Sequence, residues 1–247
     1  MDSGLYAACA GLMARTDSLD AIANNLANTS TVGFRARQGS FSSVLAEAGK
    51  HPLGSVLNQV TNNYGVFGST HLDAAQGSLT ATGNSMDFAI QGPGYFAVQT
   101  ANGTQYTRNG AFRVSPQGQL TTQSGEAVLG QGGAIRLAPG TVSVGPDGTI
   151  SSNGAVAGRL KLVEFAPGTE LQGAGNNFYT APAISERAAT QSSVNQGMLE
   201  NSNVNPVVSV VALIDAQRSA ETMRHALSMF DTELNKTAAQ DLPRVNS

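Results

Sequence analysis

Charged and aromatic side chains are scarce in this sequence of 247 residues, and tryptophan is absent altogether. Only 13% of the residues are charged and 6% are aromatic, and the formal net charge is −3. Nucleic-acid binding needs clustered lysine and arginine, which the sequence lacks, so no nucleic-acid partner is expected. No run approaches the roughly 18 apolar residues of a membrane span, so membrane insertion is not expected either.

Cysteine is almost missing too. The single Cys9 excludes an intrachain disulfide and is interpreted as a small buried hydrophobic residue. The opening residues 1–18 lack the basic segment and the continuous apolar run of a cleaved secretory signal. Composition alone therefore predicts a cytoplasmic protein without a cleaved signal peptide.

Groups of catalytic or metal-binding residues are also lacking. The histidines His51, His71 and His225 lie far apart, and none has a Cys, His or carboxylate partner at metal-ligand spacing. The glycine-rich stretches at residues 92–94 and 130–133 contain no lysine and open no helix, so we interpret them as turns and not as phosphate-binding loops. We expect no catalytic residue, metal, cofactor or small-molecule substrate.

Apolar residues recur at helical spacing at both ends of the sequence. In residues 1–28 a leucine returns at every seventh position, which predicts an amphipathic helix. A second helix is predicted over about 206–236, because Asn205 is a good N-cap and Pro206 suits the first helical position. Its start, residues 207–214, is apolar nearly all round and is predicted to be deeply buried. The two stripes consist of Leu5, Leu12, Leu19, Ile22 and Leu26, and of Leu213, Ala220, Met223, Leu227, Phe230 and Leu234.

The first predicted helix ends in a polar turn. Asparagine favours helix ends through side-chain bonds to the backbone, glycine can take a positive φ, and the phenylalanine that follows is an apolar anchor. Over residues 29–78 glycine and proline interrupt the pattern, which we interpret as an extended or loosely structured connector. The residues that mark the turn are Asn24, Asn25, Leu26, Asn28, Gly33 and Phe34.

Residues 79–194 are predicted to form a β domain. Apolar and polar residues alternate around Phe88, and Asn102-Gly103 and Asn109-Gly110 supply the turn geometry of tight hairpins. Strands recur about every eight to twelve residues, which favours an antiparallel sandwich or irregular barrel. With the C-terminal segment 195–247 carrying the second helix, the predicted fold class is α+β.

Four stretches of the sequence resemble the axial proteins of the bacterial flagellum, the family of rod and hook subunits. They are NNLANTSTVGFR at residues 24–35, DFAIQGPGYFAV at 87–98, YTRNGAF at 106–112 and SNVN at 202–205. The resemblance implies a structural subunit of the basal-body rod, not an enzyme. Such a subunit self-assembles through its terminal helices into the periplasmic shaft that transmits torque and encloses the export channel.

The same resemblance implies that the two terminal helices pair as a coiled coil and that the β domain faces outward. Implied partners are copies of the chain itself, other rod subunits and the flagellar type III export apparatus, which exports such proteins without a cleaved signal peptide. A periplasmic location in the basal body therefore replaces the cytoplasmic prediction. Two alternatives stay open: a distal rod protein of the same family, and a secreted carbohydrate-binding or adhesive β module, which would need an exposed aromatic platform.

Overall fold

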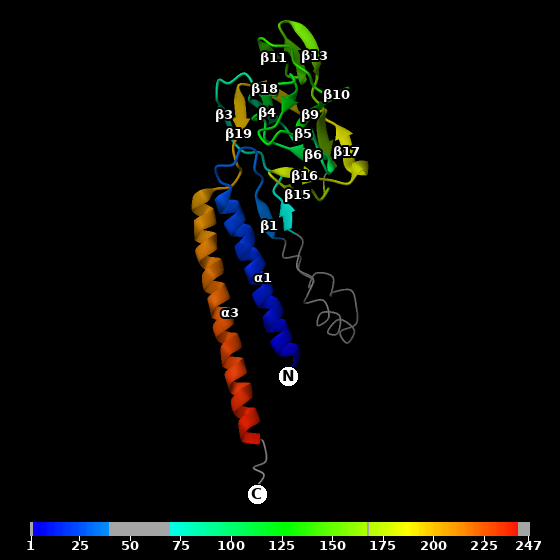
Figure 1. Cartoon of the computed structure of the whole chain (residues 1–247). Helices are drawn as coiled ribbons and strands as arrows, with labels where there is room; N and C mark the ends of the chain where they lie inside the picture. Colours follow the sequence, from blue (N-terminus) through cyan, green and yellow to red (C-terminus); the bar gives the residue numbers. More distant parts are fainter. Residues whose placement is uncertain (1, 40–69, 167, 242–247) are drawn as a thin grey trace. The chain divides into compact units, whose positions relative to one another are not determined.

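The computed structural model describes residues 2–39, 70–166 and 168–241, and the chain forms two compact units (Figure 1). One unit contains both long helices, and the other contains residues 27–38 and 71–205. The middle of the predicted connector, residues 40–69, lies outside the described residues. Neither of the long helices, as far as they are described, has a stretch apolar enough to cross a membrane.

The helical unit contains α1 (Asp2–Ala27) and α3 (Pro206–Asp241). Proline at the first position of α3 costs no hydrogen bond, because the first N–H groups of a helix have no intrahelical acceptor. Threonines inside both helices donate their hydroxyl protons to the carbonyl oxygen four residues earlier, as Thr16 does to Leu12 at 3.0 Å and Thr222 to Arg218 at 2.8 Å. These bonds satisfy hydroxyl groups that would otherwise compete with the helix backbone.

The structure has the two helices and the β domain of an α+β protein, but it does not show the predicted coiled coil. A coiled coil buries its seam, whereas Leu12, Leu19 and Leu213 are only half buried. Among the side chains that the structure describes, none from α1 or α3 belongs to either hydrophobic core cluster. A Cβ atom on Gly11 would lie 3.4 Å from Cε of Met223, which is one point of approach and not a continuous seam. That part of the prediction is wrong, because a heptad stripe shows that a face is apolar and not what covers it.

The β domain is built from short strands, and the strand pairs from β3 to β19 are antiparallel. A 3₁₀ helix, η3 (Ala183–Ser185), lies between two of them. The strands are β1 (Arg37–Gly39), β2 (Thr70–Leu72), β3 (Leu79–Ala81), β4 (Phe88–Gln91), β5 (Tyr95–Thr100), β6 (Gly103–Thr107), β7 (Arg113–Val114), β8 (Leu120–Thr121), β9 (Ala127–Gly130), β10 (Gly133–Ala134), β11 (Val142–Val144), β12 (Thr149–Ser152), β13 (Ala155–Arg159), β14 (Leu162–Phe165), β15 (Gln172–Gly175), β16 (Phe178–Thr180), β17 (Glu186–Ala188), β18 (Ser193–Gln196) and β19 (Met198–Glu200).

Strand β5 is the centre of a ten-stranded sheet with the main order β15-β16-β6-β5-β9-β8-β7. It pairs with β6 along one edge, while β9 and β14 share the other. Its side chains are buried on both faces: Phe96 and Val98 belong to one core cluster, and Tyr95 and Ala97 to another. One large sheet with several small ones thus takes the place of the predicted sandwich or barrel, since strand spacing does not reveal which strands pair.

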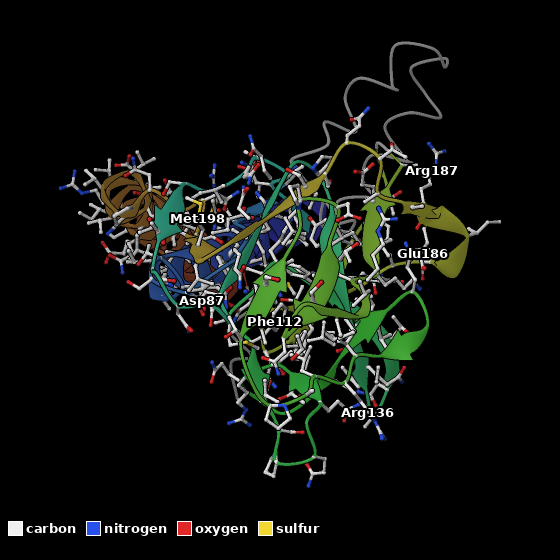
Figure 2. The ribbon with its side chains drawn as sticks, turned by 90° about the horizontal axis from the view of Figure 1, so that it is seen from above. Asp87, Phe112, Arg136, Glu186, Arg187 and Met198 are labelled. Atoms are coloured by element: carbon white, nitrogen blue, oxygen red, sulfur yellow. The ribbon has the colours of Figure 1, made fainter. Side chains whose placement is uncertain are left out.

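The larger core cluster is packed around aromatic rings. Phe112 lies edge to face with Phe96, with ring centroids 5.0 Å apart, and both rings are almost completely buried. Figure 2 shows Phe112 inside the domain, while Arg136 and Arg187 lie at its surface. A sugar-binding platform would need exposed aromatic side chains. The four candidates are instead buried in the core: Tyr95, Phe96, Tyr106 and Phe112.

Two small sheets bring the end of the β domain back to its beginning. Strand β18 pairs with β4, and β19 pairs with β3 so that Glu200 lies opposite Leu79. The last two strands before α3 therefore pair with β3 and β4, which are among the first strands of the domain.

Replacement of Phe96 by alanine should lower the free energy of unfolding by about 3–5 kcal/mol, because buried apolar area is lost and a cavity is left. Urea unfolding of the full chain measures this through tyrosine fluorescence, since Tyr95, Tyr106 and Tyr179 lie in the β domain and tryptophan is absent. Val156→Ala is the control: this side chain is 71% exposed, and the expected change is within about 0.5 kcal/mol. Similar effects of the two substitutions would contradict the described core.

Candidate functional site

The turn that follows α1 is closed by short-range hydrogen bonds. The backbone N–H of Thr31 donates to the carbonyl of Asn28 at 3.1 Å, its hydroxyl donates to Oδ1 of Asn28 at 3.0 Å, and the N–H of Phe34 donates to the carbonyl of Thr31 at 3.2 Å. Gly33 takes the positive φ of +67° that the sequence led us to expect at this turn. Asn24 and Asn25 still belong to α1, so only Asn28 reaches the turn.

Gly33 is also the point at which this turn packs against the β domain. A Cβ atom here would lie 2.4 Å from the carbonyl carbon of Arg108, closer than any side chain could approach. The N–H of Gly33 donates to the carbonyl oxygen of Glu200 at 2.7 Å. Gly33 thus touches both the segment after β6 that carries Arg108 and the strand that leads to α3.

Asn203 joins the segment that leaves α1 to the segment that enters α3. Its N–H donates to the carbonyl of Phe34 at 3.3 Å, and its Oδ1 accepts from the N–H of Ala36 at 2.7 Å. Its Nδ2 donates to the carbonyls of Asp73 and Ala75, at 3.3 and 2.9 Å. The side chain and backbone N–H of this one residue therefore bond backbone groups of two segments, residues 34–36 and 73–75, that are far from it in the sequence.

Beneath this junction lies a buried charge cluster, which consists of Arg35, Arg108 and Glu200. Nη2 of Arg35 is 3.0 Å from Oε1 of Glu200, and Nη1 of Arg108 is 3.1 Å from Oε2, with all three side chains only 1% exposed. The carboxylate also accepts a hydrogen bond from the N–H of Gly77 at 3.0 Å. One negative charge thus faces two positive charges in a part of the domain that water does not reach.

Arg108 has the most complete set of contacts in the cluster. It donates to the carbonyl of Gly92 at 2.6 Å and to that of Ile90 at 3.4 Å, and its guanidinium carbon lies 4.9 Å from the ring centroid of Tyr95. Burial lowers the pKa of Arg108; Glu200 opposes this shift and the positive charge of Arg35 adds to it. Within the described residues, Nε and Nη1 of Arg35 and Nε of Arg108 have no hydrogen-bond partner.

Tyr179 fixes the outer side of the same turn. Its hydroxyl accepts from the N–H of Arg35 at 3.3 Å and donates to Oδ1 of Asn177 at 2.9 Å, while Nδ2 of Asn177 donates to the carbonyl of Val32 at 2.7 Å. Burial raises the pKa of Tyr179 to about 12, so the phenol stays protonated and can keep this donor role. The arrangement positions backbone and charge, and it offers no nucleophile beside a base.

The sequence located part of this site and missed its charges. Gly33, Phe34 and Asn28 lie in or beside it, whereas Arg35, Arg108 and Glu200 were not singled out. The available signal was charge scarcity: Arg108 is one of only seven charged residues between positions 79 and 159, and scarce charges inside a β pattern are candidates for burial.

The predicted stripe residues lie in the helical unit. Among those whose side chains are described, Ala220 is buried. The others are half buried: Leu12, Leu19, Ile22, Leu26, Leu213 and Met223. The side chains of Leu5, Leu227, Phe230 and Leu234 lie outside the described part of the chain.

Three family models match separate parts of the chain. Residues 5–35 match the flagella basal body rod protein model, residues 89–156 the flagellar hook protein FlgE/F/G D1 domain, and residues 195–238 the flagellar basal body rod FlgEFG protein C-terminal model. Each match contains one member of the charge cluster: Arg35, Arg108 and Glu200 in turn. The chain belongs to the flagellar basal-body rod protein family.

Within this family the chain is similar over its length to proteins named FlgF. It is 38% identical to the flagellar basal-body rod protein FlgF of Mesorhizobium japonicum, over 94% of this chain and 96% of that protein, and 36% identical to FlgF of Caulobacter vibrioides over 100% of both. The FlgG protein of Buchnera aphidicola subsp. Schizaphis graminum is 32% identical over 96% of this chain and 98% of its own length. The chain length and the stretch GRLKLVEF at residues 158–165 predict FlgF first and FlgG next, which these comparisons confirm.

Family membership defines the role of the chain. It is a structural subunit of the rod in the flagellar basal body, where it assembles with other rod subunits. Its relatives are structural rod proteins, which fits a site made of fixed charges and backbone hydrogen bonds.

Gly33→Ala should destabilise the β domain more than the same substitution does at Gly83, a glycine with a similar positive φ. Gly83 is the matched control, because its φ is +72° but no atom lies within 4 Å of an added Cβ. We expect Gly83→Ala to cost about 1–2 kcal/mol from backbone strain alone and Gly33→Ala to exceed it by a further 1–2 kcal/mol or so, since the Arg108 backbone must also move. Urea midpoints of the two full-length variants decide this, and equal midpoints would contradict the close packing.

Glu200→Gln should lower the free energy of unfolding by about 3–5 kcal/mol, because it leaves two buried positive charges facing each other without a counter-charge. The comparison is Lys161→Gln, which breaks the ion pair of Lys161 with Glu186 at 3.2 Å, where both side chains are partly exposed. That loss should stay below about 1 kcal/mol. A Glu200→Gln variant as stable as Lys161→Gln would show that the cluster is not electrostatically important.

Proposed function

We propose that this subunit joins the rod through apolar residues of its two terminal helices, which pack against copies of itself and against other rod subunits. The assembled rod is the periplasmic shaft that transmits torque and encloses the export channel. The subunit reaches it through the flagellar type III export apparatus without a cleaved signal peptide, and it is not an enzyme.

The observation that carries this proposal is the exposure of the first turns of α3. The sequence predicts deep burial for residues 207–214, but Val207, Val208, Val211 and Ile214 are 72, 62, 55 and 44% exposed. Positions 207, 211 and 214 lie on one face of the helix. A group of large apolar side chains exposed together on a monomer is typical of a protein interaction surface.

The stripe residues supply a second apolar face. We propose that Leu5, Leu12, Leu19, Ile22 and Leu26 of α1 and Leu213, Ala220, Met223, Leu227, Phe230 and Leu234 of α3 also serve assembly. With them we propose a functional division into an N-terminal helix at 1–28, a connector at 29–78, a β domain at 79–194 and a C-terminal segment at 195–247.

The buried charge cluster supports assembly indirectly. Because Gly33 bonds to Glu200 and Phe34 to Asn203, the chain enters and leaves the β domain at adjacent points. Both segments that lead to the helices are thereby hydrogen-bonded to each other within the β domain. A load applied to either helix would pass into the β domain through these bonds.

A complementation experiment in cells that lack the chromosomal gene tests the proposal. The variant carries Val211→Asp and Ile214→Asp, two charges on the exposed apolar face of α3. We expect export and β-domain folding to be retained but rod assembly and swimming to be lost, because burying a carboxylate without a partner is costly.

The matched control is Ser219→Asp, which adds a carboxylate at an exposed position of the same helix turned away from this face. It should support swimming like the unmodified chain. Normal rods and motility with the double variant would overturn the proposed role of this face.

A further inference from the structure

Three asparagine–glycine pairs occur in the sequence, and all three lie in the β domain: Asn102-Gly103, Asn109-Gly110 and Asn153-Gly154. Such a pair is chemically labile. The backbone nitrogen of glycine, which no side chain shields, can attack Cγ of the asparagine and expel ammonia to form a cyclic succinimide. Water then opens the ring at either carbonyl and gives aspartate or isoaspartate.

This reaction requires the asparagine side chain to turn toward the next backbone nitrogen. Hydrogen bonds that tether the side-chain amide elsewhere therefore slow it, because they must break before the ring can form. The folded structure treats the three pairs differently in this respect.

Two of the pairs are tethered. Oδ1 of Asn153 accepts from the N–H of Thr141 at 3.0 Å, and its Nδ2 donates to the carbonyl of Pro139 at 2.8 Å. Oδ1 of Asn109 accepts from the N–H of Ala111 at 3.0 Å, and Gly110 packs so tightly that an added Cβ would overlap the carbonyl oxygen of Phe88.

Asn102 is not tethered. It lies at the exposed turn between β5 and β6, where Gly103 pairs with Thr100 and has a φ of +104°. Its backbone N–H donates to the hydroxyl oxygen of Thr100 at 3.2 Å, but its side-chain amide makes no hydrogen bond to any residue that the structure describes.

We infer that Asn102 is a selective site of spontaneous deamidation in the folded subunit, converted through a succinimide to aspartate and isoaspartate. The product carries a new negative charge in a stretch of the chain with few charges. Isoaspartate also adds one carbon to the main chain of the turn, which disturbs the register between β5 and β6 at the end where this turn connects them.

Peptide mapping by mass spectrometry tests this inference on the full-length protein at mildly alkaline pH, with the urea-unfolded protein as the reference. In the unfolded chain all three pairs should react at similar rates, since each is followed by glycine. In the folded chain Asn102 should keep a rate close to that reference, while Asn109 and Asn153 should react about tenfold or more slowly, because their tethering bonds must break first.

Asn102→Gln is the control variant, because glutamine cyclises far less readily and the turn keeps its backbone. It should remove the isoaspartate that a methyltransferase assay detects in the aged, folded protein. If Asn102 were as protected as Asn153, or if the variant accumulated isoaspartate at the unmodified rate, the inference would be wrong.

Discussion

The ion pairs that Glu200 makes with Arg35 and Arg108 constrain the rest of the structure. Removing three charged groups from water costs several kcal/mol for each ion, and the cost is recovered only when all partners are in place. The partners come from the turn after α1, from the β6 hairpin and from the strand before α3. We interpret the cluster as a device that selects one arrangement of these segments, since an apolar cluster of the same size would be satisfied by many.

The backbone around the cluster explains why this selection is strict. Gly33 sits against the Arg108 backbone with no room for a side chain. The side-chain amide of Asn203 bonds backbone groups of Ala36 and of the segment before β3, and its backbone N–H donates to the carbonyl of Phe34. A shift of one segment would leave buried donors or acceptors without partners. Packing and hydrogen bonding therefore support the same register that the charges require.

The two units of this chain differ in how far their apolar residues are buried within the single subunit. The β domain covers its own apolar residues, because both faces of β5 are buried by side chains of the same domain. The helices do not, because Val211, Ile214 and Met229 remain exposed on α3 and most of the described stripe residues are only half buried. We propose that other subunits cover this apolar surface in the assembled rod.

The sequence by itself determined the local features: two helices from periodicity, short strands between turn signals, a positive φ at Gly33, and the family from four motifs. These depend on neighbouring residues, so they can be read along the chain. The tertiary structure decided what depends on contacts between distant segments: one large sheet in place of a sandwich, exposed valines at the start of α3, no buried coiled-coil seam among the described helix side chains, and the meeting of Arg35, Arg108 and Glu200. Their positions are far apart in sequence, and only the packing of distant strands and turns brings such groups within 3 to 4 Å or so, which no local pattern encodes.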